Sequence, residues 1–127
     1  MKKQKEIFKP VLGFEKNYLV TNTGRVWSIK RKRFLNPTKD VYGYYYHQLS
    51  DGNGYNRAYK LHRIVFEAFR GELPKNFDVD HLDGNKANNN INNLLGLSHG
   101  EHIRRHRIGK VTSEATRLKI SETRRKL

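Results

Sequence analysis

The chain has 127 residues and no cysteine, and 26 Lys and Arg against 12 Asp and Glu give it a formal net charge of +14. The lack of cysteine excludes disulfides and thiolate zinc sites. Because no window is apolar enough for a signal peptide or a membrane span, we expect an intracellular, cytoplasmic protein. So basic a chain is suited to bind a polyanion, and nucleic acid is the favoured partner.

The N-terminal part of the chain is predicted to form β-hairpins. The segment YLVTNTGRVWSIK (18–30) has β-branched and aromatic residues on both sides of a turn in which Gly24 suits a positive φ. The segment GYYYHQLSDGNGYNRAYKL (43–61) predicts a second hairpin, whose turn is supplied by Asp51 to Gly54. Its tyrosines are expected to be mainly half-buried residues of the sheet.

A short helix is predicted next. The segment LHRIVFEAFRG (61–71) has apolar residues at helical spacing, and Gly71 followed by Pro74 ends the pattern. We expect this helix to pack on the sheet, and we interpret His62 at its start as a structural residue.

The second half of the chain predicts the order strand, long loop, strand, helix. DVDHL (78–82) and NLLGLS (93–98) are short extended pieces separated by an asparagine-rich loop, and HGEHIRRHRI (99–108) is expected to be helical. Asparagine is poor in helices and strands, but its amide both donates and accepts hydrogen bonds, which suits a closed loop. The tail after residue 108 is too polar for a core helix and predicts a solvated or nucleic-acid-bound extension.

This loop and its flanks contain a candidate hydrolytic metal site. Such a site needs a few ligands, an open position and a nearby base. Asp80 offers a carboxylate, and His102 offers an imidazole from the following helix. Asp80 and His81 are neighbours on an extended segment, so their side chains point to opposite sides. We therefore expect Asp80 to bind the metal and His81 to act on water.

Other metal sites fit this stretch less well. The calcium-loop pattern fails, since a loop starting at Asp78 has Leu82 at its fifth position and Asp83 at its sixth. A closed structural zinc site is disfavoured by the lack of cysteine. For His99 and His106, metal binding, phosphate contact and a plain surface position all stay open, and we favour the last two.

The stretch VDHLDGNKANNNINNLLGLSHGEH (79–102) resembles the HNH endonuclease motif of phage and intron-encoded homing endonucleases. The resemblance implies that Asp80 and His102 are metal ligands, that His81 is the general base and that Asn93 fixes the loop. The spacings from His81 to Asn93 and on to His102 also resemble those of the family. The implied cofactor is a divalent metal, with Mg²⁺ favoured and Mn²⁺, Zn²⁺ or Ni²⁺ as alternatives.

The resemblance extends to the flanking segments. VLGFEKNYLVTNTGRVWSIK (11–30) looks like the β module that often precedes HNH motifs, and the tail resembles a nuclease-associated DNA-binding repeat. We therefore expect an α+β fold with N-terminal antiparallel β-hairpins, a short helix, a ββα-metal (His-Me finger) core and a basic C-terminal extension. The expected domains are 1–60 for the β module, 61–107 for the helix and HNH core, and 108–127 for the tail.

The function implied is metal-dependent hydrolysis of DNA phosphodiester bonds by a phage or mobile-element homing endonuclease that nicks or cuts both strands. The expected partner is double-stranded DNA, bound by a monomer or a homodimer. The alternatives are a non-catalytic DNA-binding module with a structural metal loop and an RNA-binding or ribosome-associated protein. The basic residues expected to contact phosphates are Arg25, Lys30, Arg31, Lys32, Arg33, Arg57, Lys60, Arg63, Arg104, Arg105, Arg107, Lys110, Arg117 and Lys119.

Overall fold

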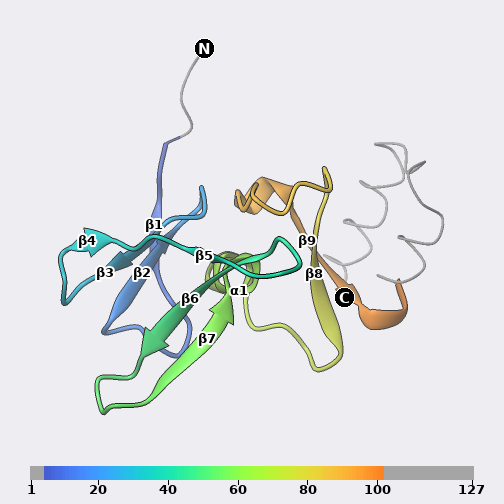
Figure 1. The fold of residues 1–127 in the computed structure, drawn as a ribbon. Coiled ribbons are helices and arrows are strands. Elements are labelled where there is room, and N and C mark those ends of the chain that lie inside the picture. Colours follow the sequence, from blue (N-terminus) through green and yellow to red (C-terminus); the bar gives the residue numbers. More distant parts are fainter. Residues whose placement is uncertain (1–4, 102–127) are drawn as a thin grey trace.

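Three antiparallel sheets and a central helix make up the part of the chain that the computed structural model describes, residues 5–101 (Figure 1). The elements in chain order are β1 (Phe8–Pro10), β2 (Tyr18–Thr21), β3 (Val26–Ser28), β4 (Arg33–Phe34), β5 (Thr38–Lys39), β6 (Tyr45–Ser50), β7 (Asn56–Lys60), α1 (Leu61–Arg70), β8 (Phe77–His81), the 3₁₀ turn η1 (Ile91–Asn93) and β9 (Leu94–Ser98). The expected α+β fold with N-terminal hairpins is confirmed. The predicted basic tail lies outside the described residues.

The first sheet has the strand order β1-β2-β3-β4 and contains the first predicted hairpin. Strands β2 and β3 pair with Leu19 opposite Trp27, so the predicted hairpin is confirmed. Gly24 lies in its turn with a φ of +99°, as the sequence pattern required. Val20 and Val26 are fully buried, which fixes the face of this sheet that points to the core.

The second sheet, β5-β6-β7, contains the second predicted hairpin. Along β6, His47 and Leu49 are buried while Gln48 between them is exposed, which is the alternation of a half-covered strand. The turn is held by Asp51, whose carboxylate accepts a hydrogen bond from the Asn53 N–H at 2.7 Å. The predicted turn chemistry is therefore confirmed.

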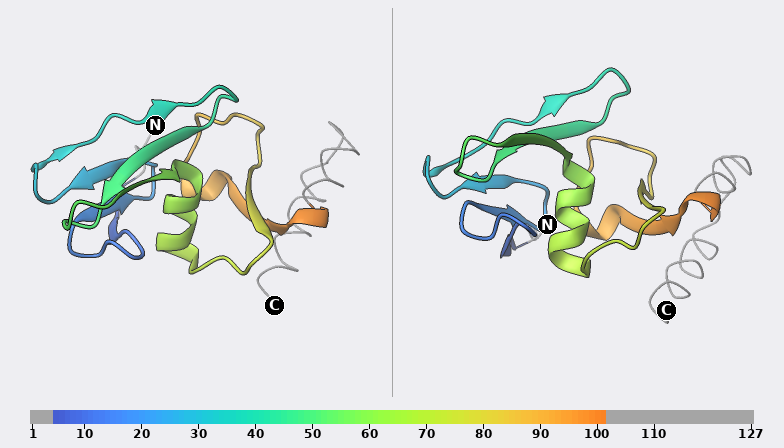
Figure 2. Two further views of the ribbon diagram at one scale, coloured as in Figure 1. Left: turned by 60° about the horizontal axis from the view of Figure 1, so that its bottom comes forward. Right: turned by 90° about the horizontal axis from the view of Figure 1, so that it is seen from below.

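Helix α1 forms the centre of the core. Leu61, Ile64 and Val65 are buried on it, and they belong to one apolar cluster that includes residues of the first two sheets and of β8. The helix ends where predicted, at Gly71, whose N–H donates to the Glu67 carbonyl. The two views in Figure 2 show α1 between the N-terminal sheets and the β8–β9 hairpin.

The third sheet is the β8–β9 hairpin, in which Phe77 pairs with Ser98 and His81 with Leu94. Its strands are joined by the long asparagine-rich loop and η1, and the backbone is helical again at residues 99–101. Gly96 on β9 packs closely on α1, because a Cβ there would lie 2.8 Å from Phe66 Cζ and would displace that ring. No helix in the described residues is long and apolar enough to cross a membrane.

Candidate active site

The asparagine-rich loop is closed by hydrogen bonds between its two ends. The amide of Asn93 donates from Nδ2 to Asp83 Oδ1 and to the Asn88 carbonyl, both at 2.9 Å. In return, Asn93 Oδ1 accepts from the Asp83 N–H at 3.1 Å. Burial acts to raise the pKa of Asp83, but hydrogen bonds from Asn88, the Asn85 N–H and Asn93 outweigh it and hold that pKa below its usual range. Asp83 is therefore ionised as it organises the loop.

Asp80 and His81, the predicted metal ligand and predicted base, end strand β8. Both are buried, with 6% and 4% of their surface exposed. Because adjacent residues on a strand point to opposite faces, both faces of this strand end are covered. The His81 Nε2 lies 2.8 Å from the Asn89 Oδ1, and this hydrogen bond is buried. The loop thus places one of its asparagines directly on the predicted base.

Two other rings surround His81. The His62 ring of α1 lies with its centroid 5.1 Å away, and the Tyr44 ring before β6 lies 6.1 Å away. Burial lowers the pKa of His81, although the Asn89 hydrogen bond and the Asp83 charge act to raise it. Burial also lowers the pKa of His62, to about 3, with help from the neighbouring His81. The two imidazoles are therefore both neutral near pH 7, and a neutral imidazole is the form that can accept a proton.

Two lysine ammonium groups lie near the Tyr44 ring. The Nζ of Lys86, in the loop, is 4.4 Å from the centroid of the Tyr44 ring and donates to the Tyr42 carbonyl at 2.7 Å. The Nζ of Lys60 lies 5.3 Å from the same ring and forms an ion pair with Asp40. The Lys86 ammonium thus places positive charge near His81. Its hydrogen bond to Tyr42 also links the loop to the β5–β6 hairpin.

The predicted metal site is only partly within the described residues. Asp80 supplies a hard carboxylate of the kind that divalent cations prefer, whereas His102 lies outside the described residues. Within residues 5–101, no three His, Asp or Glu side chains gather closely enough to hold a metal ion. His99 is exposed and its Nδ1 lies 3.1 Å from the Asp78 carboxylate, so it is in a surface pair. His106 lies outside the described residues.

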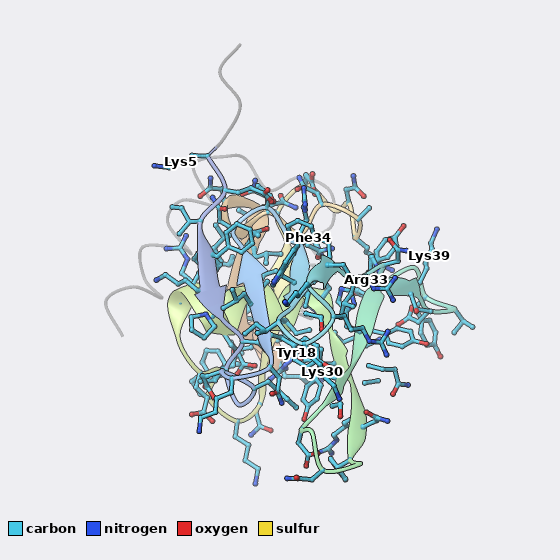
Figure 3. The ribbon with its side chains drawn as sticks, turned by 90° about the vertical axis from the view of Figure 1, so that its left-hand side faces the viewer. Lys5, Tyr18, Lys30, Arg33, Phe34 and Lys39 are labelled. Carbon is cyan, nitrogen blue, oxygen red and sulfur yellow. The ribbon has the colours of Figure 1, made fainter. Side chains whose placement is uncertain are left out.

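The predicted phosphate contacts fall into different environments. Lys30 to Arg33 are exposed around the turn from β3 to β4, and Arg57 is exposed on β7. Figure 3 views this side of the molecule, with Lys30, Arg33 and Lys39 on it. The Arg25 guanidinium stacks on Phe34, 3.4 Å from the ring centroid.

Three of these basic residues have partners inside the protein, and Arg25 is the first, since its guanidinium also lies 3.5 Å from the Glu6 carboxylate. Lys60 pairs with Asp40, and Arg63 donates to the Phe77 carbonyl at 3.3 Å. The predicted contacts that lie outside the described residues are Arg104, Arg105, Arg107, Lys110, Arg117 and Lys119.

Sequence reasoning missed the residues that surround His81. The sequence pattern indicates only a sheet position for Tyr44 and a structural position for His62, and it assigns Asn89 no role of its own. No local signal distinguishes Asn89 from Asn88 or Asn90, because the difference is which one faces His81.

Comparison with known proteins places these elements in a family. A family model described as HNH endonuclease matches residues 59–104, and a model described as NUMOD4 motif matches residues 6–50. The protein YosQ of Bacillus subtilis (strain 168), named as an HNH homing endonuclease derived from the SPbeta prophage, is 32% identical over 124 residues. This match covers 82% of the present chain and 69% of YosQ. The chain belongs to the HNH endonuclease family.

Other HNH endonucleases agree with this assignment. DNA endonuclease I-HmuI of Bacillus phage SP01 is 38% identical over 87 residues, which cover 68% of this chain and 49% of I-HmuI. A solved structure described as DNA binding and cleavage by I-HmuI superimposes with a TM-score of 0.75 at 31% identity, covering 88% of this chain and 65% of that one. An HNH endonuclease of Acanthamoeba polyphaga mimivirus is 42% identical over 79 residues, which cover 61% of this chain and 23% of that endonuclease. The present chain thus spans half or less of the length of several curated HNH relatives. The resemblance to the HNH family that the sequence predicted is confirmed.

Proposed function

We propose that this chain is a metal-dependent DNA endonuclease of the homing type, which hydrolyses phosphodiester bonds with His81 as general base. One observation carries the proposal: a buried imidazole with a lowered pKa is held by a hydrogen bond at the end of β8, next to the Asp80 carboxylate. The sequence position of this pair in the HNH motif supports the same roles. So does the name of the phage relative I-HmuI, a DNA endonuclease.

The hydrogen bond to Asn89 decides which nitrogen of His81 can act. An amide oxygen only accepts, so the neutral imidazole donates from Nε2, and the lone pair is on Nδ1. Nδ1 would take the proton from a water molecule as that water attacks phosphorus. A positioned general base of this kind contributes roughly 10²- to 10⁴-fold to a rate.

Asp80 and His102 would hold the divalent metal. When bound, a divalent ion stabilises the negative charge that develops on the phosphorus oxygens and on the leaving oxygen. We propose Mg²⁺ as the physiological ion, and Mn²⁺, Zn²⁺ and Ni²⁺ are tested as alternatives. Asn93 would keep the loop closed through its hydrogen bonds to Asp83 and Asn88, so that Asp80 and His81 keep their positions.

Double-stranded DNA is the proposed partner. The exposed cations from Lys30 to Arg33, together with Arg57, offer phosphate contacts that fix position without reading sequence. The net charge of +14 supports attraction to DNA over the whole chain. The alternative of a non-catalytic DNA-binding module predicts the same binding without cleavage.

Cleavage of supercoiled plasmid tests the proposal. The parent protein should convert the plasmid to nicked or linear DNA with Mg²⁺ and should stop when the metal is chelated. His81→Ala should lose about 10²- to 10⁴-fold in rate and keep its DNA affinity. His99→Ala is the matched control, because His99 is exposed on the surface.

Two results would contradict the proposal. If His81→Ala cuts as fast as the parent, the assignment of the base is wrong. If the parent binds DNA but cuts it with none of the four metals, the non-catalytic module is the better description. The ratio of nicked to linear product also shows whether one or both strands are cut.

A further inference from the structure

We infer that the turn between β2 and β3, Asn22–Gly24, positions His81 through Asn89, so that the N-terminal β module is part of the catalytic apparatus. Figure 1 shows this turn reaching toward the segment that precedes β9. The inference rests on the proposed function of His81 as a base. The β2–β3 turn of the first sheet thereby has a positioning role for a residue of β8, although the two segments are far apart in the sequence.

The first link joins Asn89 to His81. Asn89 is 5% exposed, and its Oδ1 lies 2.8 Å from the His81 Nε2. The other atom of the same amide, Nδ2, donates to the Lys86 carbonyl at 3.3 Å. This second bond sets the orientation of the amide, because Nδ2 can only donate and so Oδ1 is left to face the imidazole. Asn89 therefore fixes both the ring orientation and the tautomer of His81.

The second link is a close contact between Gly24 and Asn89. A Cβ built on Gly24 would lie 3.0 Å from the Asn89 Cβ and 3.0 Å from its carbonyl oxygen. The neighbouring atoms are backbone and the root of a side chain, which cannot swing away as the tip of a long side chain can. The turn backbone thus packs directly against Asn89, and a Cβ at residue 24 would fit only if Asn89 shifted.

The third link is Asn22, which fastens the turn to its surroundings. Its carbonyl accepts a hydrogen bond from the Ile91 N–H at 2.8 Å, two residues after Asn89. Its side chain accepts from the Ile7 N–H at 2.7 Å and donates to the Lys5 carbonyl at 3.0 Å. Asn22 is 5% exposed, so these bonds are shielded from water. One turn of the N-terminal sheet therefore holds the loop at Asn89, through Gly24, and two residues later, through Asn22.

These three links make a specific prediction about rate and affinity. Displacing the turn should move Asn89 and free the His81 ring to rotate, because the ring would lose its acceptor. Misplacing a reacting group by about 1 Å can cost on the order of 10²-fold in rate. DNA affinity should change little, since neither Gly24 nor Asn89 carries charge.

The test compares two glycine variants. Gly24→Ala adds a Cβ that meets Asn89, whereas Gly54→Ala adds one that meets nothing within 4 Å. Both glycines have a positive φ, +99° and +87°, so the two variants share the backbone strain and differ in the contact. Cleavage of a short duplex is measured at saturating protein in a single turnover, and the duplex affinity is measured in chelator. We expect Gly24→Ala to lose about 10- to 100-fold in cleavage rate relative to Gly54→Ala, with affinities within about twofold of each other.

A spectroscopic readout separates positioning from general loss of structure. The ¹⁵N shifts of the His81 ring, read at a pH where the ring is neutral, report which nitrogen carries the proton. The parent and Gly54→Ala should show the proton on Nε2. Gly24→Ala and Asn89→Ala should show a mixture of tautomers. Asn89→Asp keeps an acceptor for the ring but loses the donor to the Lys86 carbonyl, so it should shift the mixture back toward Nε2.

The outcomes are distinct. If Gly24→Ala matches Gly54→Ala in both rate and His81 signals, the inference is overturned. If Gly24→Ala fails to fold, Asn89→Ala carries the test, and an unchanged tautomer there overturns the inference. If the tautomer shifts as expected but the parent cleaves no DNA, the positional link stands and the proposed function fails.

Discussion

Asp83 and Asn93 hold the two ends of the asparagine-rich loop together with reciprocal hydrogen bonds. The Asn93 Nδ2 donates to the Asp83 carboxylate at 2.9 Å, and the Asp83 N–H donates to the Asn93 Oδ1 at 3.1 Å. The asparagine-rich loop has little apolar surface to bury. Hydrogen bonds such as these therefore stabilise its conformation. We propose that Asn93 fixes the loop through these bonds, the role that the resemblance implied for it.

Removing this side chain should open the loop. Asn93→Ala deletes the bonds to Asp83 and Asn88, and we expect the free energy of unfolding to fall by about 1 to 3 kcal/mol. The amide protons of Leu82 and Asp83 should exchange faster with solvent, which hydrogen-exchange NMR measures. Asn92→Ala is the control, because Asn92 is the exposed neighbour. Equal exchange in the two variants would contradict a special role for Asn93.

Buried histidines should make the protein less stable in mild acid. Burial lowers the pKa of His47 to about 4 and that of His62 to about 3, against an ordinary value of 6.5. The unfolded chain therefore binds protons before the folded protein does as the pH falls below about 6.5. Their contribution to stability is complete above that pH and is lost as the pH falls toward 4.

Urea unfolding at pH 7.5, 6.0 and 5.0 checks this expectation. Each histidine should contribute up to about 1.4 kcal/mol per pH unit below 6.5. Carboxylates titrate mostly below this window, so it reports mainly on the histidines. His47→Gln removes one titrating group and should flatten the slope. A slope equal to that of the parent would show that His47 is not the source.

The exposed cations around the β3–β4 turn should give DNA binding a strong salt dependence. Each phosphate contact lowers the slope of log affinity against log salt by about 0.9 for duplex DNA. Replacing Lys30, Arg31 and Arg33 by Gln should therefore make that slope shallower by about 2 to 3 if each makes one phosphate contact. Lys75→Gln is the control, since Lys75 is exposed in the loop between α1 and β8. An unchanged slope would exclude this turn from the DNA contact.

Asp80 should be needed for metal binding and not for DNA binding. Asp80→Asn keeps the size of the side chain and removes its charge, so we expect weaker Mn²⁺ binding by calorimetry and loss of metal-dependent cleavage. DNA affinity in chelator should stay within about twofold of the parent, as expected when no phosphate contact is lost. Asp51→Asn, in the exposed β6–β7 turn, is the control. Normal Mn²⁺ binding by Asp80→Asn would show that Asp80 is not a metal ligand.

Local sequence patterns predicted the main elements of this fold but not the short strands β1, β4 and β5 or the turn η1. The two hairpins and α1 follow from turn residues, alternating exposure and helical spacing, which act between residues close in the chain. The order strand, loop, strand and the return to helical backbone at His99 were predicted in the same way. Neighbours along the chain are enough to set these features, because backbone conformation depends mainly on local sterics and hydrogen bonds.

The sequence by itself determined the motif around Asp80, His81 and Asn93, because the type and spacing of those residues are written in one short stretch. Only the tertiary structure decided that Asn89, among several asparagines, meets His81, and that Gly24 of a distant hairpin seats it. It also brought His62 of α1 and Tyr44 against the same ring. The physical reason is that the neighbouring asparagines of the loop have the same side chain and so the same local conformational preferences. Which one is buried against a given partner depends on how α1 and the three sheets pack, and that packing is set by apolar burial over the whole core.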